Sequence, residues 1–200
     1  ELAPLLNATT SDEELASCDV VLEAIVENAA VKKGIYARLE SRLKPSALLA
    51  SNTSTIPIAQ LAEGLSRPER FLGIHFFNPV RRMPLVEVIR GPKTSHEAVA
   101  TAVAYAKQIG KSPIVVHDGP GFLVNRLLFP YMNEALELLT EGVEIKAIER
   151  AAKDFGMPMG PITLYDVVGL DTAMFAGRVM WEAFPDRITA SPILPALRGE

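Results

Sequence analysis

The segment "DVVLEAIVE", residues 19–27, decides the fold class of this chain. It is almost continuously apolar and rich in β-branched residues, which is typical of a strand whose two faces are both covered by helices. An apolar stripe at helical spacing follows, formed by Val31, Ile35, Leu39 and Leu43. Lys32 and other charged residues fall on the remaining faces of this amphipathic helix, which stops before Pro45. The pattern therefore predicts a strand of a parallel sheet and its crossover helix.

The same alternation continues through the first half of the chain. Further strands are predicted at residues 47–51, 71–77, 85–90 and 112–117. The short helix after the second strand has Ser54 or Thr55 available as its cap and Pro57 near its first turn. A longer helix is predicted around residues 99–109. Strands that alternate with helices predict a doubly wound α/β layer.

The character of the sequence changes at "HDGPGF", residues 117–122. Its glycines and proline break any regular element, and no convincing strand follows them, so we place a domain boundary here, between residues 1–117 and residues 118–200. Helical periodicity dominates the second part, in which one helix ends near Gly156. Residues 191–200 show no strong periodicity. The second domain is therefore predicted to be all-α.

The composition excludes several classes of function. The chain has 200 residues, a formal net charge of -4 and a pI near 5.5, so it lacks the basic character that attracts nucleic acid or anionic lipid. Every apolar run is shorter than the about 18 residues needed to span a bilayer. A single cysteine, Cys18, cannot form an intrachain disulfide, which fits a reducing compartment, the cytoplasm. No histidine has metal-type spacing to another histidine or to Cys18, so we expect no metal site.

Polar residues follow the predicted strands at the point where each strand ends. Ligands of open α/β sheets bind beyond the carboxyl ends of the strands, so these residues are the candidates for function. They are Glu27, Asn28, Lys32, Ser51, Asn52, Thr53, Ser54, His75 and Asn78. We expect them to converge on one crevice.

His75 and Glu87 interrupt two neighbouring apolar strands. Imidazole accepts and returns a proton near neutral pH, and such a base needs a partner that orients it. A carboxylate at position 87 costs several kcal/mol to bury unless another group hydrogen-bonds it, and an imidazole is a suitable partner. The two residues together predict a catalytic His–Glu pair. The alternative is a structural histidine and a glutamate that faces solvent.

The other candidates have structural explanations as well. Ser54 is equally a helix cap, and Asn52 equally satisfies a turn. Lys32 and Glu27 are equally solvated surface charges. Asn125 is ambiguous between a hydrogen bond at the start of a helix and an active-site amide.

Five segments carry a resemblance to a known family. They are "VVLEAIVEN", "ASNTSTIPI", "GIHFFNPVRRMPLVEVIRG", "PGFLVNRLLFPYMNEAL" and "GMPMGPITLYDVVGLDT". In order and spacing, over roughly residues 19–184, they resemble the L-3-hydroxyacyl-CoA dehydrogenases, especially the dehydrogenase part of the multifunctional fatty-acid β-oxidation enzyme. The resemblance implies a Rossmann-type NAD-binding sheet, an all-α C-terminal domain, and oxidation of the 3-hydroxyl of an acyl-CoA with NAD. As protein partners it implies a second copy of the chain or a thiolase of a β-oxidation complex.

The resemblance also assigns roles to single residues of this chain. His75 corresponds to the general base, and Glu87 to the residue that orients it. Ser54 corresponds to a hydrogen-bond donor to the reacting oxygen, and Asn125 to a residue that fixes substrate and histidine. The positions that match cofactor contacts of the family are Ile25, Val26, Glu27, Lys32, Asn52, Ser54 and Asn78.

The glycine-rich turn of the family has no match in this chain. The family begins with a strand, a GxGxxG turn and a helix whose amino end holds the cofactor pyrophosphate. No GxGxxG occurs among these 200 residues. We therefore expect a Rossmann-type parallel sheet that lacks its first glycine-rich βαβ unit, in a fragment that binds NAD weakly and has little or no activity alone.

Two functions of other classes stay open at this point. Ser54, His75 and Glu87 have the residue types of a Ser-His-Glu hydrolase, although Ser54 lacks the GxSxG elbow. The missing glycine turn also leaves open a non-catalytic module that provides a packing surface in a larger assembly.

Overall fold

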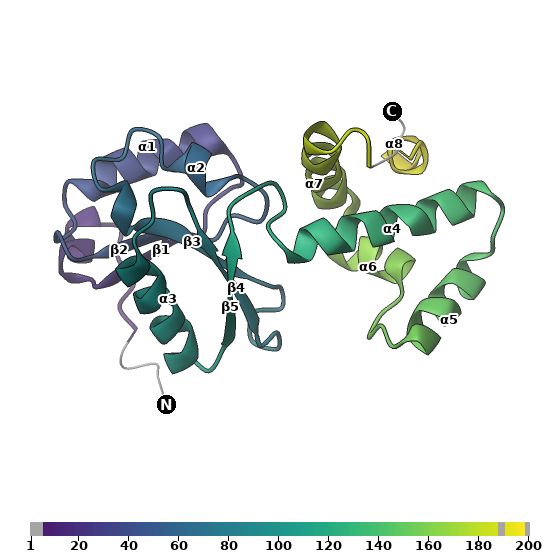
Figure 1. Ribbon diagram of the computed structural model, residues 1–200, viewed down its shortest axis with the longest axis horizontal. Helices are drawn as coiled ribbons and strands as arrows, with labels where there is room; N and C mark the ends of the chain where they lie inside the picture. Colours follow the sequence, from purple (N-terminus) through teal and green to yellow (C-terminus); the bar gives the residue numbers. More distant parts are fainter. Residues whose placement is uncertain (1–5, 188–190, 199–200) are drawn as a thin grey trace. The chain divides into compact units, whose positions relative to one another are not determined.

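The computed structural model describes residues 6–187 and 191–198, and the chain divides into two compact units, Glu1–Gly119 and Pro120–Glu200 (Figure 1). The first unit contains all the strands among the described residues. The second contains only helices and their connections among those residues. The predicted fold class, an α/β sheet followed by an all-α part, is confirmed.

A five-stranded sheet with the order β1-β2-β3-β4-β5 forms the centre of the first unit. Its strands are β1 (Val20–Glu23), β2 (Leu48–Ser51), β3 (Phe71–Phe76), β4 (Leu85–Arg90) and β5 (Ser112–His117). The pairs β1/β2, β2/β3 and β4/β5 are parallel, whereas β3/β4 is antiparallel. The sheet is therefore mixed, and the expectation of a wholly parallel sheet is corrected at this pair. Residues 77–84 between β3 and β4 are fewer than the dozen or so that a parallel crossover needs.

Helices cover both faces of the sheet. They are α1 (Ala29–Glu40), α2 (Ile58–Leu61) and α3 (His96–Gln108), with short 3-10 helices at Asp12–Ser17 and Pro68–Arg70. Figure 1 shows α1 and α2 on one face and α3 on the other. The core against α3 is formed by Leu48, Ala50, Leu72, Ile74, Val86 and Val88 of the strands and by Ala98, Ala102 and Ala106 of the helix. Because successive strand residues point to opposite faces, Ser51, His75 and Glu87 point to the α1/α2 face.

Two local predictions in this region were wrong. The first strand ends at Glu23 rather than continuing to Glu27, because the Glu23 side chain accepts a hydrogen bond from the backbone of Ile25 and the chain leaves the sheet there. The predicted stripe is buried at Leu39 and Leu43, but it is displaced in the first turns of α1, where Val31 is 46% exposed while Lys32 and Tyr36 are buried. The polar partners of Lys32 and Tyr36, described below, explain why these residues rather than Val31 face the sheet.

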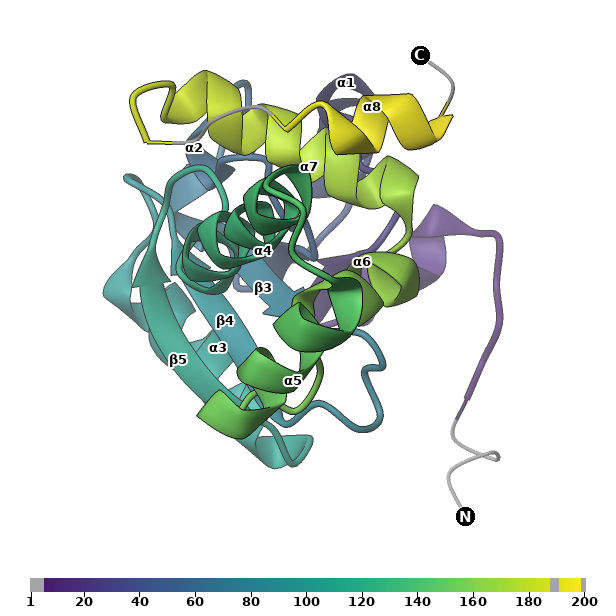
Figure 2. The same cartoon turned by 90° about the vertical axis from the view of Figure 1, so that its right-hand side faces the viewer.

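The second unit is a group of packed helices. They are α4 (Val124–Thr140), α5 (Ile145–Phe155), α6 (Pro161–Val168), α7 (Leu170–Ala183) and α8 (Ile193–Arg198). Met132, Leu136, Tyr165 and Ala173 form its buried core. As predicted, α5 ends at Gly156, which has the left-handed φ of 111° that favours glycine. Helix α8 was not predicted, and it lies beside α7 (Figure 2).

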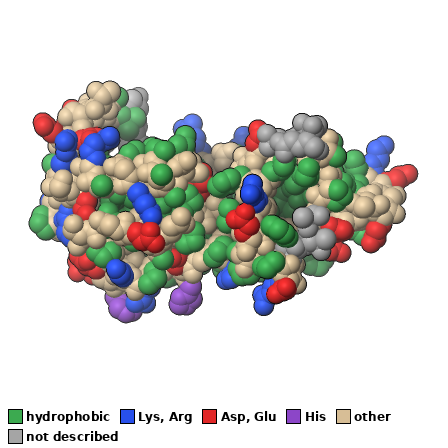
Figure 3. Space-filling model, turned by 90° about the horizontal axis from the view of Figure 1, so that it is seen from above, with side chains coloured by type: hydrophobic (Ala, Val, Ile, Leu, Met, Phe, Trp, Pro, Cys, Tyr) green, Lys and Arg blue, Asp and Glu red, His purple; other side chains and the backbone are tan. Residues whose placement is uncertain are grey.

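The surface carries no single dominant charge on the side seen in Figure 3, where acidic and basic side chains are interspersed over the first unit. None of the helices among residues 6–187 and 191–198 combines the length and the apolar character needed to cross a membrane.

Asp118, directly after β5, caps the N-terminus of α2. Its two carboxylate oxygens accept hydrogen bonds from the backbone nitrogens of Ile58 and Ala59, both at 2.7 Å. The predicted cap, Ser54 or Thr55, was wrong, because Pro57 occupies the cap position and has no side-chain hydrogen bond. A residue far away in sequence thus satisfies the amide groups that a helix start leaves without partners.

Replacing Asp118 by Ala is expected to expose these two amides. Loss of a charge-assisted cap of about 1–2 kcal/mol should speed hydrogen exchange of the Ile58 and Ala59 amides about tenfold or more. Hydrogen exchange followed by NMR or mass spectrometry measures this rate. Glu63→Ala, which removes an exposed ion pair with Lys33, is the control and should leave both amides unchanged. Equal exchange in the two variants would contradict the cap.

Candidate active site

The carboxyl ends of β1, β2 and β3 lie along one edge of the sheet, because these three strands are parallel. The strands end there at Glu23, Ser51 and Phe76. The loops that follow them carry most of the residues selected from the sequence. This edge is where ligands of open α/β sheets bind.

His75 and Glu87 face each other across the antiparallel pair β3/β4. Nδ1 of His75 lies 2.8 Å from Oε2 of Glu87. The His75 side chain is 5% exposed and that of Glu87 is 0% exposed, so the contact is shielded from water. The predicted contact between the two side chains is confirmed, and both residues are buried rather than turned to solvent. When Nδ1–H donates to the carboxylate, Nε2 is the basic nitrogen of the ring.

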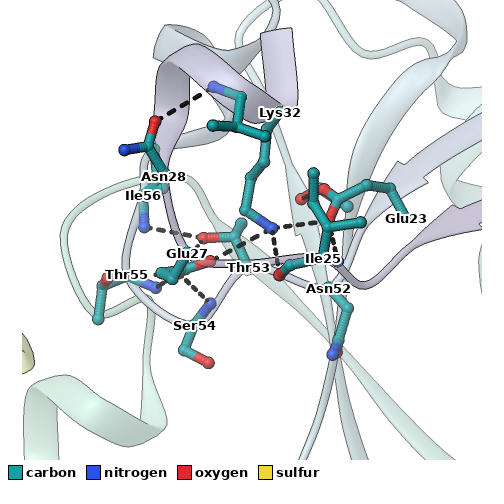
Figure 4. Close-up of polar contacts among 12 residues, drawn as sticks. Glu23, Ile25, Glu27, Asn28, Lys32, Asn52, Thr53, Ser54, Thr55 and Ile56 are labelled. Atoms are coloured by element: carbon teal, nitrogen blue, oxygen red, sulfur yellow. Dashed lines mark hydrogen bonds and ion pairs between the residues drawn. The ribbon is translucent and has the colours of Figure 1, made fainter. Parts of the chain in front are cut away.

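Glu27 organises the turn after β2 (Figure 4). Its Oε1 accepts hydrogen bonds from the backbone nitrogens of Ser54 and Thr55, at 2.8 and 3.2 Å, and from the hydroxyl of Thr53, at 2.6 Å. The hydroxyl of Thr53 in turn accepts a bond from the backbone nitrogen of Ile56 at 3.0 Å. The backbone of the turn is thus folded around one carboxylate oxygen, and Figure 4 shows the Ser54 side chain pointing away from it.

Lys32 is buried beside two carboxylates. Its Nζ lies 2.7 Å from Oε1 of Glu23 and 3.3 Å from Oε2 of Glu27, and its side chain is 1% exposed. The interpretation of Lys32 as a solvated surface charge was therefore wrong. Glu27 is 28% exposed at its side chain and is paired, so it is not a simple surface charge either.

Glu23 was not singled out from the sequence, although it anchors this cluster. Its four hydrogen bonds come from Lys32, the backbone of Ile25, the hydroxyl of Tyr36 and the hydroxyl of Ser51. Burial opposes ionisation, but these donors together lower the pKa of Glu23 below its ordinary value. Burial, followed by the hydrogen bond to Glu23, raises the pKa of Tyr36, so the phenol stays protonated and remains a donor. A glutamate at the end of an apolar strand was the available sequence signal.

The remaining candidates of the first unit fall into two groups. Asn28 is the N-cap of α1 and accepts from the backbone nitrogen of Val31, and Asn52 accepts from the backbone nitrogen of Phe76 at 2.9 Å. Both therefore have structural partners, but the partner of Asn52 lies on β3 and not in the turn that the alternative describes. The other group is exposed, and it consists of Ile25 (37%), Val26 (65%) and Asn78. Exposed apolar side chains directly after β1 provide a surface for an apolar ring.

Asn125 is the second residue of α4, in the helical unit. Its role toward His75, which belongs to the other unit, stays a prediction. The helical unit has a largely apolar cavity of about 350 Å³ that contains none of the predicted site residues. Its lining includes Phe129, Tyr165, Met174, Met180 and Trp181. Among the described residues, no group of three or more Cys, His, Asp or Glu side chains is arranged to hold a metal ion.

Two family models match almost the whole chain. The model described as "3-hydroxyacyl-CoA dehydrogenase, NAD binding domain" matches residues 1–119, and the one described as "3-hydroxyacyl-CoA dehydrogenase, C-terminal domain" matches residues 121–198. The chain belongs to the 3-hydroxyacyl-CoA dehydrogenase family. This is a family of NAD-dependent oxidoreductases, and the resemblance found in the five sequence segments is thereby confirmed.

Solved structures of similar sequence have the same fold. FadB2 of M. tuberculosis is 38% identical, with a TM-score of 0.93 over 98% of this chain and 71% of that chain. The (S)-3-hydroxybutyryl-CoA dehydrogenase PaaH1 of Ralstonia eutropha is 40% identical, with a TM-score of 0.91 over 96% of this chain and 69% of that chain.

A curated relative shows the family context at higher identity. The fatty acid oxidation complex subunit alpha of Ectopseudomonas oleovorans is 55% identical over 191 residues, which are 94% of this chain and 27% of that protein. The chain therefore spans about a quarter of the length of the curated relatives that it matches.

Proposed function

We propose that this chain supplies the base and part of the cofactor site for NAD-dependent oxidation of L-3-hydroxyacyl-CoA to 3-ketoacyl-CoA. The single observation that carries the proposal is the buried His75–Glu87 contact of 2.8 Å at the ligand-binding edge of the sheet. Family membership supplies the reaction class, and the contact supplies a base. A hydroxyl group becomes a carbonyl group only if it loses a proton from oxygen and a hydride from carbon.

His75 removes the proton. Its Nε2 accepts the proton of the 3-hydroxyl, and the oxygen then forms a double bond to C3 as the hydride leaves that carbon. NAD, when bound, supplies the hydride acceptor. The imidazolium that forms faces the Glu87 carboxylate, which offsets its charge inside a site of low water content. The base is therefore oriented and its charged form stabilised by the same carboxylate.

The residues at the strand ends fit one part of NAD. Ile25 and Val26 present apolar surface to a ring, and Asn78 presents an amide at the end of β3. The Thr53 hydroxyl and the backbone amides of Ser54 and Thr55 are bound to Glu27, so the turn contributes the Ser54 hydroxyl, a group of the kind that binds a carboxamide or a ribose. Binding of the pyrophosphate would rely on a glycine-rich turn that is not found among these 200 residues.

Ser54 is proposed to donate a hydrogen bond to the reacting oxygen. Replacing Ser54 by Ala should lower kcat by about tenfold to a hundredfold, because that bond strengthens as charge develops on the oxygen. Steady-state kinetics that follow NADH formation measure this change, in the longest natural polypeptide that contains these residues. Ser46→Ala, at an exposed position of the same unit, is the control and should keep the unaltered kcat. Equal kcat values for both variants would remove Ser54 from the reaction.

The dehydrogenase is favoured over a Ser-His-Glu hydrolase, because both family models and the solved relative PaaH1 are described as dehydrogenases. We also propose that the chain is located in the cytoplasm and that it is part of a multienzyme complex of fatty-acid oxidation. The name of the curated relatives, subunit alpha of a fatty acid oxidation complex, supports this context. An acyl-CoA is the proposed substrate, and a thiolase or a second copy of the chain is the proposed protein partner.

The proposed reaction is tested with the longest natural polypeptide that contains this chain. We expect NAD reduction that depends on an L-3-hydroxyacyl-CoA, with no ester hydrolysis. The L and D substrates serve as a matched pair, since a site built on one fixed base should oxidise only one enantiomer. Absence of NAD reduction with acyl-CoAs of several lengths would contradict the proposal.

A further inference from the structure

Glu23 of β1 and Lys32 and Tyr36 of α1 form a buried charged cluster. Glu23, Lys32 and Tyr36 are 5%, 1% and 0% exposed. Neither Glu23 nor Tyr36 takes part in the reaction proposed above. Burying two opposite charges costs free energy unless their hydrogen bonds are satisfied. Apolar packing alone therefore does not explain why these residues are buried.

The Glu23 carboxylate is fixed in place by its donors. Oε1 accepts from Nζ of Lys32 at 2.7 Å and from the backbone nitrogen of Ile25 at 2.6 Å. Oε2 accepts from the hydroxyl of Tyr36 and from the hydroxyl of Ser51 at 2.8 Å. Two bonds at each oxygen, from the loop after β1, from α1 and from β2, leave this carboxylate with one orientation.

Lys32 connects this fixed carboxylate to a second one. Its ammonium group has three acceptors within reach, which are Glu23, Glu27 at 3.3 Å and the backbone oxygen of Ile25 at 3.5 Å (Figure 4). The ammonium group donates hydrogen bonds to Glu23 and Ile25, and it forms an ion pair with Glu27. With 1% of its side chain exposed, Lys32 has no accessible surface to offer a cofactor.

Glu27 binds the backbone of the turn that carries Ser54. Its Oε2 faces Lys32, while its Oε1 binds the backbone nitrogens of Ser54 and Thr55. Lys32 therefore separates two carboxylates and offsets their repulsion. Without that charge, Glu27 would be repelled by Glu23 and would turn toward solvent, to which 28% of its side chain is already exposed. The Ser54 and Thr55 amides would then lose their acceptor.

We propose that Glu23, Lys32 and Tyr36 form a positioning relay that acts through Glu27 to hold the turn carrying Ser54. The relay rests on the proposed function for its effect on the reaction, but its effect on the turn is independent of it. Lys32 accordingly acts as a positioning residue and not as a cofactor contact, which revises the role that the resemblance implies.

Two adjacent lysines of α1 provide a matched test. Lys32→Met removes the buried charge, whereas Lys33→Met removes a partly exposed lysine that pairs with Glu63. In the longest natural polypeptide, without NAD or substrate, Lys32→Met should speed hydrogen exchange of the Ser54 and Thr55 amides about tenfold, while amides of α3 stay unchanged. With substrate and NAD, kcat should fall about tenfold and the KM for NAD should change less than about twofold. Lys33→Met should leave the exchange rates of the Ser54 and Thr55 amides, kcat and the KM for NAD unchanged.

Unchanged exchange at the Ser54 and Thr55 amides in Lys32→Met would overturn the relay, whatever the activity. A large rise in the KM for NAD with kcat retained would also overturn it, because that pattern marks a direct cofactor contact. If the unaltered protein reduces no NAD but Lys32→Met still loosens the two amides, the relay stands and the proposed function fails.

Tyr36→Phe keeps the proposal testable if Lys32→Met does not fold. The phenylalanine ring keeps the packing against Phe71, whose ring centroid lies 5.0 Å from that of Tyr36, and removes only the hydroxyl. We expect exchange of the same two amides to rise about threefold, since Glu23 retains three of its four donors. No increase would contradict the relay.

Discussion

Replacing His75 by Gln is expected to lower kcat by about three orders of magnitude, because the base that accepts the hydroxyl proton is removed. Glutamine is close in size, and its amide can donate to Glu87, so the buried carboxylate keeps a partner. Binding of NAD should be nearly unchanged, because the imidazole is proposed to act on the proton of the substrate. Steady-state kinetics and calorimetric titration with NAD, on the longest natural polypeptide that contains this chain, measure the two quantities.

His117→Gln is the control for this substitution. His117 ends β5 and is exposed, so the same chemical change there should leave kcat within about twofold of the unaltered value. A His75→Gln variant that keeps a near-normal rate would show that another group takes the proton. A variant that loses NAD binding together with its rate would show that His75 supports the cofactor site instead.

Replacing Glu87 by Gln should lower kcat by about two orders of magnitude or more. The shape of the side chain is preserved, but two properties of the carboxylate are lost. The amide can donate to Nδ1 of His75, and this favours the tautomer in which Nε2 carries the hydrogen and cannot act as a base. The imidazolium that forms in the reaction also loses its opposite charge, inside a site where Glu87 is 0% exposed.

Glu97→Gln serves as the matched control for Glu87. Glu97 pairs with Arg70 at 3.0 Å, but its side chain is 81% exposed, so its charge contributes little and the rate should not change. The decisive comparison is kcat at saturating NAD and substrate. A Glu87→Gln variant as active as Glu97→Gln would mean that the carboxylate is only a buried partner of His75.

The fold was largely predictable because its apolar segments have clear periods. The segments at residues 47–51, 71–77, 85–90 and 112–117 all contain strands of the sheet. The direction of β4 was not predicted, since apolar runs look alike in parallel and antiparallel pairs. The length of the β3–β4 connection was the signal that decides it.

The site was predictable where an ionisable residue interrupts an apolar strand. His75 and Glu87 stand out in this way, and their contact follows from the register of β3 and β4. The cluster behind Ser54 was not predictable in the same way. Lys32 and Tyr36 resemble ordinary polar positions of an amphipathic helix. Their burial depends on Glu23, whose side chain accepts hydrogen bonds from both of them and from Ser51 of β2.

The caps and the last helix show a further limit. Asp118 is distant in sequence from the helix that it caps, so local capping rules selected Ser54 and Thr55 instead. Helix α8 is short, and it is stabilised by packing beside α7 rather than by its own periodicity.

The most direct test of the account is a structure of the longest natural polypeptide with NAD and a 3-ketoacyl-CoA. We predict that Nε2 of His75 lies at hydrogen-bonding distance, about 3 Å, from the oxygen on C3, while Nδ1 keeps its contact with Glu87. A C3 oxygen that is bound elsewhere, with no path of one water molecule to Nε2, would contradict the assignment of His75 as the base.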